Sequence, residues 1–531
     1  MLILFVLLFV GNFCCSVAVA GKKLWQRKEV NWRISGGSRI KAVNYPADKP
    51  PLTLNEHRRS KRKVRLEQIA PSTTPALGQT VFAAVIDSPP IDGFVPWIIV
   101  SVTDEAGGFW DMDAVPETSV IGDPLTENPQ SDYVIGIYDT GASTHVIGDD
   151  HALKTGIAPD MVTSLEIELL GATGTATGYT TQPLGIFIAG LDSLEPNGLL
   201  IDNSRMVGET NVSIIAGDPV ESPNLPTAIG MPMAVYFNAA FCNNKQISVT
   251  IDGNDFNSPY IEFYSLSDSC TPSYSNLIDL QLRPSDAGAV QYFPCDLLAL
   301  CGDEPDGTPV YPSMIWGGFS NQSLYFLPWV NVQDGDDSIT NLDGFMLDTG
   351  AQITVISRTI ASGMHLSTSN PDFWVEIQDV TGQITNEPGF FLDSLEIPAD
   401  GQWLEYTNVP VVAINVLSPE GGYLDGIIGM NLFVDLNFVI KGGGMAGQGY
   451  YPTLEFEPVS RIPGDIAGNC YQCKVDYLDL AAFTNAWLAT YNPRTTNWNP
   501  NADMAPQPTP DKNIDFLDFA VLADHWLETI P

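Results

Sequence analysis

The sequence predicts a mainly β protein of two related lobes, followed by a small all-α module at the C-terminal end. Segment 137–147 returns as 346–356, 209 residues later, so one set of elements occurs twice. A second repeat relates 475–488 to 514–527, and its apolar residues are spaced as on one face of a helix. The repeats predict an N-terminal lobe at 76–240, a C-terminal lobe at 241–460 and the helical module at 465–531. An N-terminal apolar run and a cluster of basic residues predict a signal peptide at 1–20 and a pro-segment or linker at 21–75.

The composition excludes several classes of protein. The chain has 531 residues, of which 44% are hydrophobic and 16% charged, so neither disorder throughout nor a coiled coil is expected. The net charge of −39 excludes a general nucleic-acid-binding protein, because too few cations remain to cover a phosphate backbone.

The first twenty residues predict export. An apolar run over 1–10 precedes Ala18-Val19-Ala20, which is the small-residue pattern of a signal-peptide cleavage site. An uncleaved signal anchor is the alternative, although the run is short for a membrane span. A secreted, periplasmic or cell-surface location follows.

Six cysteines lie beyond this segment: Cys242, Cys270, Cys295, Cys301, Cys470 and Cys473. They allow fifteen disulfide connectivities, of which pairing between sequence neighbours is the simplest.

Each copy of the first repeat contains an Asp-Thr-Gly turn after an apolar strand, at Asp139 and at Asp348. Glycine tolerates the backbone angles of a tight turn that exposes the preceding carboxylate. Alternating strand patterns follow at 165–168 and 375–378, and each half closes on two apolar residues and a glycine. A pseudo-twofold axis would place the two carboxylates side by side.

This ordered set of motifs resembles the aspartic peptidases over about residues 80–460. The two-lobed chain is similar to pepsin. The sequence Asp-Thr-Gly-Ala followed by Thr-Val-Ile, and Asp-Gly-Ile-Ile-Gly-Met at 425–430, are closer to the retroviral-protease branch. The resemblance implies a pepsin/retropepsin-like acid protease fold and a secreted endopeptidase that acts on peptide or protein substrates.

The resemblance also implies roles for individual residues. Asp139 and Asp348 would be the catalytic dyad. The residues that would join the two turns across the lobe interface and let their backbones approach are Thr140, Gly141, Thr349 and Gly350. Two hairpin flaps would cover the substrate, with Gly174, Tyr179 and Gly382 as flap residues.

Charge explains how such a dyad would work. Two carboxylates about 3 Å apart cannot both ionise, so they share one proton, and no metal cofactor is required. Ala142 and Ala351 stand where pepsins carry a serine, so a hydroxyl donor to the ionised Asp is missing. We therefore expect raised pKa values and activity in mildly acidic solution. His145 would either tune the dyad or be satisfied within its own lobe.

The basic segment has two interpretations. Between Gly21 and Leu66 the chain carries fourteen Lys or Arg and three acidic residues, a net charge of +11 beside −50 in the remainder. This layout resembles a zymogen, in which a cationic pro-segment masks an anionic enzyme until the carboxylates are protonated. A solubilising or envelope-binding linker is the alternative.

The C-terminal repeat resembles a dockerin module, in which acidic loops before two helices bind calcium. The calcium ligands that this resemblance implies are Asp511, Asp515 and Asp518, and the implied partner is a cohesin-like or other cell-surface protein. Earlier ligand positions hold Gln507 and Thr509 instead. For the whole chain, the alternative to a peptidase is a catalytically silent fold that serves as an extracellular binding module.

Overall fold

The computed structural model describes the two lobes, the helical module and two short N-terminal strands. Its described residues are 6–7, 40–41, 82–103, 133–170, 175–182, 184–194, 206–212, 214–222, 225–251, 254–266, 268–284, 323–378, 384–400, 402–418, 422–443, 451–459, 463–467, 474–490, 499–505 and 511–528. Apart from the two short strands, the expected signal peptide and basic segment lie outside these residues. None of the described helices is long and apolar enough to cross a membrane.

The first lobe is built on a ten-stranded sheet with the order β1-β7-β8-β11-β6-β12-β5-β4-β9-β10. Its strands are β1 (Val6–Leu7), β4 (Trp97–Thr103), β5 (Val134–Tyr138), β6 (Val146–Ile147), β7 (Val162–Leu170), β8 (Thr175–Thr181), β9 (Leu184–Gly190), β10 (Val207–Val212), β11 (Ile215–Gly217) and β12 (Ala228–Ile229). Central strands such as β4 and β9 are buried at every residue, and most of their residues are apolar.

The second lobe is built on a twelve-stranded sheet whose main path is β16-β17-β20-β25-β21-β24-β23-β18-β19. These strands are β16 (Gln281–Pro284), β17 (Ser323–Leu327), β18 (Val330–Asp334), β19 (Asp337–Leu342), β20 (Phe345–Leu347), β21 (Val355–Ile356), β23 (Ile384–Ala399), β24 (Gln402–Ala413) and β25 (Gly426–Ile428). Off this path, β2 (Ile40–Lys41) pairs with β22 (Phe373–Gln378), β22 pairs with β23, and β3 (Phe82–Asp87) pairs with β24.

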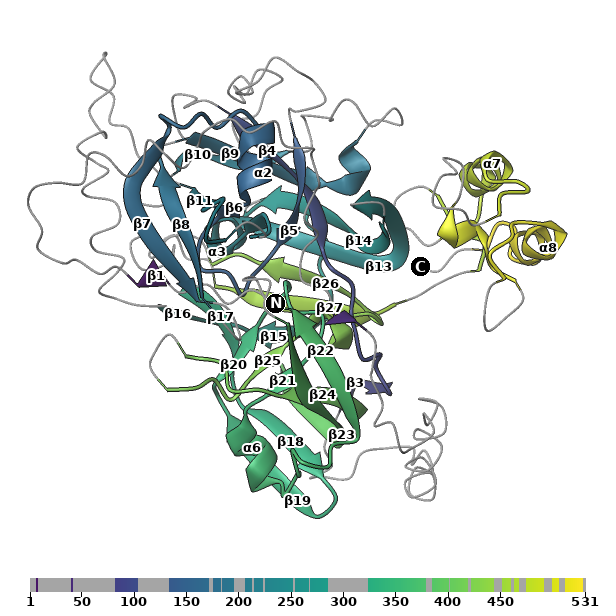
Figure 1. Ribbon diagram of the computed structural model, residues 1–531. Helices are drawn as coiled ribbons and strands as arrows, with labels where there is room; N and C mark the ends of the chain where they lie inside the picture. The colour runs from purple at the N-terminus through teal and green to yellow at the C-terminus, as the bar shows by residue number, and fades with distance from the viewer. Residues whose placement is uncertain are drawn as a thin grey trace, which may run out of the picture.

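A third sheet of five strands lies between the lobes in Figure 1. Its order is β14-β13-β26-β27-β15, formed by β13 (Phe237–Ile251), β14 (Asn254–Ser265), β15 (Asn276–Asp279), β26 (Leu436–Lys441) and β27 (Thr453–Pro458). Strands from both halves of the chain therefore meet in one sheet, because β13 pairs with β26.

The two lobes repeat one strand topology around their Asp-Thr-Gly turns. In the first lobe β12 lies parallel to β5 and antiparallel to β6. In the second lobe β25 lies parallel to β20 and antiparallel to β21. A helix of six residues follows each turn at the same offset, α2 (Asp149–Lys154) and α6 (Arg358–Gly363). The predicted mainly β, two-lobed architecture is confirmed.

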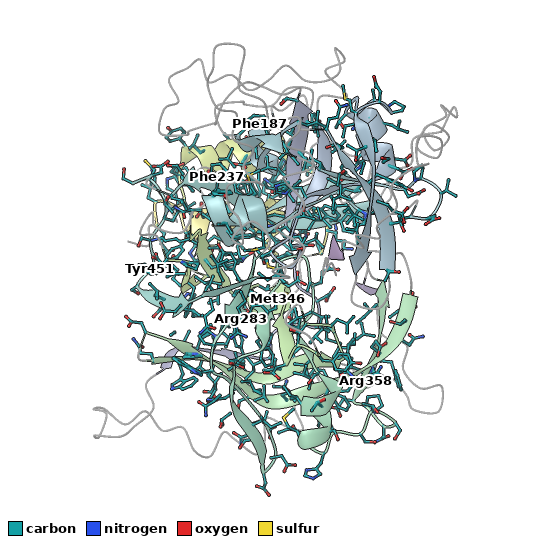
Figure 2. All side chains as sticks on the ribbon, turned by 90° about the vertical axis from the view of Figure 1, so that its left-hand side faces the viewer. Phe187, Phe237, Arg283, Met346, Arg358 and Tyr451 are labelled. Carbon is teal, nitrogen blue, oxygen red and sulfur yellow. The ribbon has the colours of Figure 1, made fainter. Side chains whose placement is uncertain are left out.

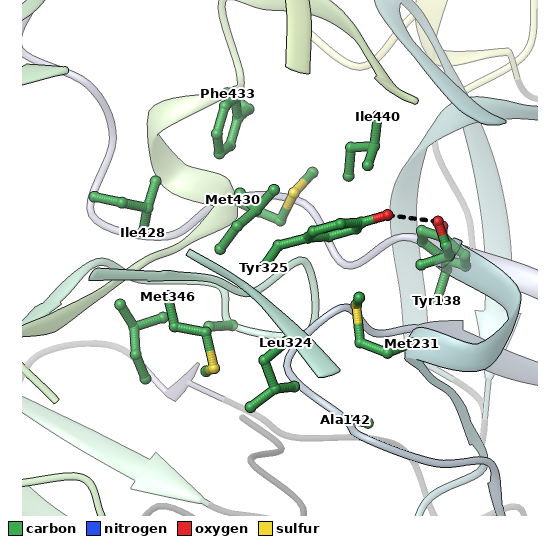
Figure 3. Packing of buried hydrophobic residues seen from close by; sticks show 14 of the residues in the cluster. Tyr138, Ala142, Met231, Leu324, Tyr325, Met346, Ile428, Met430, Phe433 and Ile440 are labelled. Atoms are coloured by element: carbon green, nitrogen blue, oxygen red, sulfur yellow. Dashed lines mark hydrogen bonds between the residues drawn. The ribbon is translucent and has the colours of Figure 1, made fainter. Parts of the chain in front are cut away.

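One apolar core continues through both lobes, and Figure 2 shows one of its residues, Met346, near the junction between them. It includes Tyr138, Ala142 and Met231 from the first lobe and Tyr325 and Met346 from the second. Figure 3 shows these residues packed together. Tyr325 Oη crosses the interface and donates to the carbonyl oxygen of Ala234 in α3 (Met231–Tyr236), at 2.8 Å. The turns thus pack against an apolar interior that both lobes share.

The C-terminal module has a small core of its own, which includes Ile466, Phe483, Ile514 and Leu522. It contains α7 (Tyr477–Asn485), the short 3-10 turn η8 (Pro500–Ala502) and α8 (Phe516–Asp524), which lie together at one side of the molecule in Figure 1. Helices α7 and α8 are the expected helical pair. The resemblance of the module to a dockerin stays a prediction.

The cysteine pairing between sequence neighbours is wrong for Cys242 and Cys270. Cys270 carries a free, exposed thiol in a turn where its backbone N–H donates to Asp268. Cys242 is fully buried in β13. Cys242 is disulfide-bonded, and because the Cys270 thiol is free, the partner of Cys242 is another cysteine. The other four cysteines lie outside the described residues.

Candidate active site

Each Asp-Thr-Gly turn begins where a buried parallel strand ends. Asp139 follows β5 and its backbone N–H donates to the carbonyl oxygen of Ile229 in β12, at 2.9 Å. Asp348 follows β20 and donates in the same way to Ile428 in β25, at 3.1 Å. The neighbouring strands therefore fix both aspartates at equivalent positions of their lobes.

The two threonines join the turns across the lobe interface. Thr140 Oγ1 donates to the carbonyl oxygen of Leu347 at 2.9 Å and accepts from Thr349 N at 3.1 Å. Thr349 Oγ1 donates to the carbonyl oxygen of Tyr138 at 2.7 Å and accepts from Thr140 N at 3.0 Å. All four bonds are buried, so the two turns are locked together by a symmetric network.

The two glycines lie directly against the carboxyl groups of the opposite lobe. A Cβ atom on Gly141 would stand 2.4 Å from Asp348 Cγ, and one on Gly350 would stand 2.5 Å from Asp139 Cγ. No side chain fits into such a gap. The structure thus brings together Asp139, Thr140, Gly141, Asp348, Thr349 and Gly350.

Burial dominates the electrostatics of the aspartate pair, because Asp139 is 1% and Asp348 0% exposed. Burial, and then the charge of Asp348, raises the pKa of Asp139 well above its ordinary value. Burial raises the pKa of Asp348 to about 6. The two side chains are within hydrogen-bonding reach of each other, and neither Oδ2 receives a bond from a described donor. Such a bond needs a proton on one carboxyl group, since an ionised carboxylate only accepts.

His145 has a partner within its own lobe. Its Nδ1 accepts a hydrogen bond from the backbone N–H of Gly230 at 3.2 Å, and the ring is fully buried. Thr354, its equivalent in the second repeat, accepts from Gly429 N at 3.2 Å with Oγ1. The two residues therefore have the same role, because each accepts a hydrogen bond from the glycine that follows the parallel strand of its lobe. Asn431, which sequence analysis did not single out, holds Thr354 through two bonds of 2.8 Å.

Two hairpins occupy the positions expected for flaps, β7–β8 in the first lobe and β22–β23 in the second. Figure 1 shows both running toward the junction between the lobes. Gly174 and Gly382 lie outside the described residues. Tyr179 lies in β8, where burial, and then the charge of Glu166, raises its pKa to about 12. Its flap role stays a prediction.

The expected calcium ligands of the C-terminal module are engaged in other bonds. Asp518 is fully buried; its Oδ1 accepts from Met504 N and Ala505 N, and its Oδ2 from Asp515 N. Asp515 Oδ1 caps α8 by accepting from Leu517 N at 2.7 Å. Asp511 accepts from a backbone N–H in its own loop. No group of three acidic, His or Cys side chains among the described residues is placed to hold a metal. Calcium binding by this loop stays a prediction.

Sequence analysis missed one acidic residue of this loop, Asp503. Its Oδ2 accepts from Lys512 N at 2.9 Å, whereas its Oδ1 is buried and receives no hydrogen bond from the residues that the structure describes. Burial raises the pKa of Asp503 to about 6. The signal lay in a short parallel between the two loops, Asp465-Ile-Ala and Asp503-Met-Ala.

Comparisons with known proteins agree with part of this description. Residues 340–432, which include the second Asp-Thr-Gly turn, match the family model of aspartyl proteases. This match supports an aspartic-peptidase fold. A search of curated proteins finds no match.

Similarities to solved structures are distant. An aspartic proteinase from Irpex lacteus is 13% identical with a TM-score of 0.32, covering 69% of this chain and 97% of that one. Basic 7S globulin from soybean is 8% identical with a TM-score of 0.33, covering 71% and 98%. Conglutin gamma from lupine seeds is 10% identical with a TM-score of 0.27, covering 68% and 96%. Similarity at this level says nothing about the activity of the present chain.

Proposed function

We propose that the protein is an exported aspartic endopeptidase in which Asp139 and Asp348 activate water between them. The observation that carries this proposal is the buried, symmetric aspartate pair, in which each carboxyl group touches the glycine of the opposite turn. The match of residues 340–432 to aspartyl proteases supports it. The apolar run before Ala18-Val19-Ala20 supports export.

The reaction follows from one shared proton. The ionised carboxylate takes a proton from water, whose oxygen attacks the scissile carbonyl carbon. The protonated carboxyl group donates to the carbonyl oxygen as negative charge develops there. When the tetrahedral intermediate collapses, the C–N bond breaks and the dyad returns a proton to the leaving nitrogen. The products are a carboxylic acid and an amine, and the dyad is restored. The substrate would lie extended between the β7–β8 and β22–β23 hairpins.

Denatured casein tests this proposal across pH 3–7, with and without a pepstatin-type inhibitor. We expect inhibitor-sensitive cleavage by the wild type and none by Asp139→Asn or Asp348→Asn. The raised pKa values predict an acidic limb in the mildly acidic range. A rate that still rises below about pH 2.5 would contradict this environment for the dyad.

The same assay decides the alternative, a silent fold that serves as a binding module. A folded wild type without cleavage at any pH, and without inhibitor binding, would favour that alternative. For the C-terminal module, we propose attachment of the enzyme to a cell-surface partner, which pull-down with and without residues 465–531 tests.

A further inference from the structure

A bulge in β13 directs one lysine out of the lobes. The pairing of β13 with β14 shifts register between Cys242 and Gln246, and Lys245 lies in this bulge. Asn243 fixes it, since its Nδ2 donates to the carbonyl oxygens of Phe433 and Leu436 at 2.9 and 2.6 Å. Bulges commonly re-aim a side chain. Here the bulge aims Lys245 at the C-terminal module.

The ammonium group of Lys245 contacts the first acidic loop of that module, which precedes α7 and includes Asp465 and Asp476. Nζ lies 2.9 Å from Asp465 Oδ1 and also donates to the carbonyl oxygen of Ala467. The side chains of Lys245 and Asp465 are only 1% and 4% exposed. A buried charge of either sign requires a partner, so this pair is a specific contact and not an incidental surface bridge.

The loop before α7 and the loop before α8, which includes Asp503 and Asp515, have the same pattern of hydrogen bonds. In the first loop, Asp479 Oδ1 accepts from the two N–H groups that follow Asp465. In the second, Asp518 Oδ1 accepts from the two N–H groups that follow Asp503. Oδ2 of Asp465 and of Asp503 each accept a backbone N–H. The loops differ in their ion pairs: Lys245 Nζ lies 2.9 Å from Asp465 Oδ1, whereas no Lys or Arg among the described residues forms an ion pair with Asp503.

Two polar contacts join the module to the body, and the first is that of Lys245 with Asp465 and Ala467. The apolar core of the module contains only residues between 466 and 522. A second contact joins Asn501 Nδ2 to the carbonyl oxygen of Gln246, next to Lys245, at 3.0 Å. Both contacts lie at the β13 bulge, so this bulge is where the described residues join the module to the body.

We propose that Lys245 docks the C-terminal module onto the protein's own body, with its ammonium group as the cation of the first acidic loop. The module surface that includes Asp465 and Asn501 binds the β13 bulge of the same chain. Docking is independent of divalent metal, because the carboxylate that a metal would neutralise is already paired with Lys245.

Hydrogen exchange of the full chain tests this proposal, read at the amides of α7 with and without EDTA. We expect no effect of EDTA on the wild type. Lys245→Met leaves Asp465 buried without its counter-charge, so exchange in α7 should accelerate by about tenfold or more. Lys474→Met is the matched control, because Lys474 bridges Asp476 at 2.7 Å on the same loop but is half-exposed. That variant should change exchange by less than about twofold.

A double variant separates loss of docking from loss of folding. Asp465→Asn alone should also accelerate exchange in α7. Adding it to Lys245→Met removes both buried charges, so the double variant should exchange more slowly than Lys245→Met alone. Amides of β5 report whether the body stays folded. The proposal is overturned if EDTA accelerates exchange in the wild type, if Lys245→Met behaves like Lys474→Met, or if the two charge removals simply add.

Discussion

At the scale of single residues, burial raises the pKa of Asp348, which the Asp-Thr-Gly motif identifies. Its carboxyl group is fully buried between the lobes, and its pKa rises to about 6. The folded state therefore binds protons more readily than the unfolded chain does. The stability linked to this group is fully present below about pH 4 and is lost as the pH rises through about 6.

Asp348→Asn should reduce this pH dependence. Between pH 4 and 7 the wild type should lose of order 1–3 kcal/mol of its unfolding free energy through this group, and the variant should lose less. Urea denaturation at several pH values measures the difference. Asp400→Asn, in the exposed β23–β24 turn, is the control and should follow the wild type. Parallel curves for wild type and Asp348→Asn would contradict the prediction.

Thr349 links the two lobes at the scale of single atoms. Thr349→Val removes a hydroxyl group that serves both Tyr138 O and Thr140 N, with little change in shape. Two buried backbone groups lose a partner, so we expect a loss of about 1–3 kcal/mol in unfolding free energy and a marked loss of proteolysis. Thr349→Ser should retain most of both. A valine variant as stable and active as the serine variant would rule out the hydrogen bonds as the cause.

At the scale of elements, the two Asp-Thr-Gly turns are supported by equivalent hydrogen bonds. His145 and Thr354 each accept a bond from the glycine after the parallel strand. His145→Thr keeps an acceptor at this position, whereas His145→Leu keeps the volume and loses the acceptor. We expect His145→Thr to melt at a higher temperature than His145→Leu. The reverse order would mean that packing outweighs the bond to Gly230.

The helices of the C-terminal module begin with capping boxes in which Asp476 with Asp479, and Asp515 with Asp518, satisfy the first backbone N–H groups. Asp518→Ala removes the acceptor of three backbone N–H groups. We expect the module to lose about 2 kcal/mol or more of stability, with or without calcium. Asp524→Ala, exposed at the end of the same helix, is the control. Hydrogen exchange in α8 measures both, and rescue of Asp518→Ala by calcium would contradict this structural role.

At the scale of the whole molecule, the apolar cores predict how the protein unfolds. One core spans both lobes, and a separate core holds the C-terminal module. The two lobes should therefore unfold in one cooperative transition, and the module in another. Calorimetry of the full chain, with hydrogen exchange to assign each transition, tests this. Separate transitions for the two lobes would show that the shared core does not couple them.

The sequence alone identified the repeat, the strand patterns and the two acidic turns, because these signals lie within a few residues of one another. It also predicted the helical pair, whose apolar spacing is local. The tertiary structure decided what these residues touch. The bonds between Thr140 and Thr349 join residues 209 positions apart, and Lys245 meets a carboxylate 220 positions further along the chain. Local periodicity carries no information on such pairs, because packing of the lobes and the bulge in β13 brings them together.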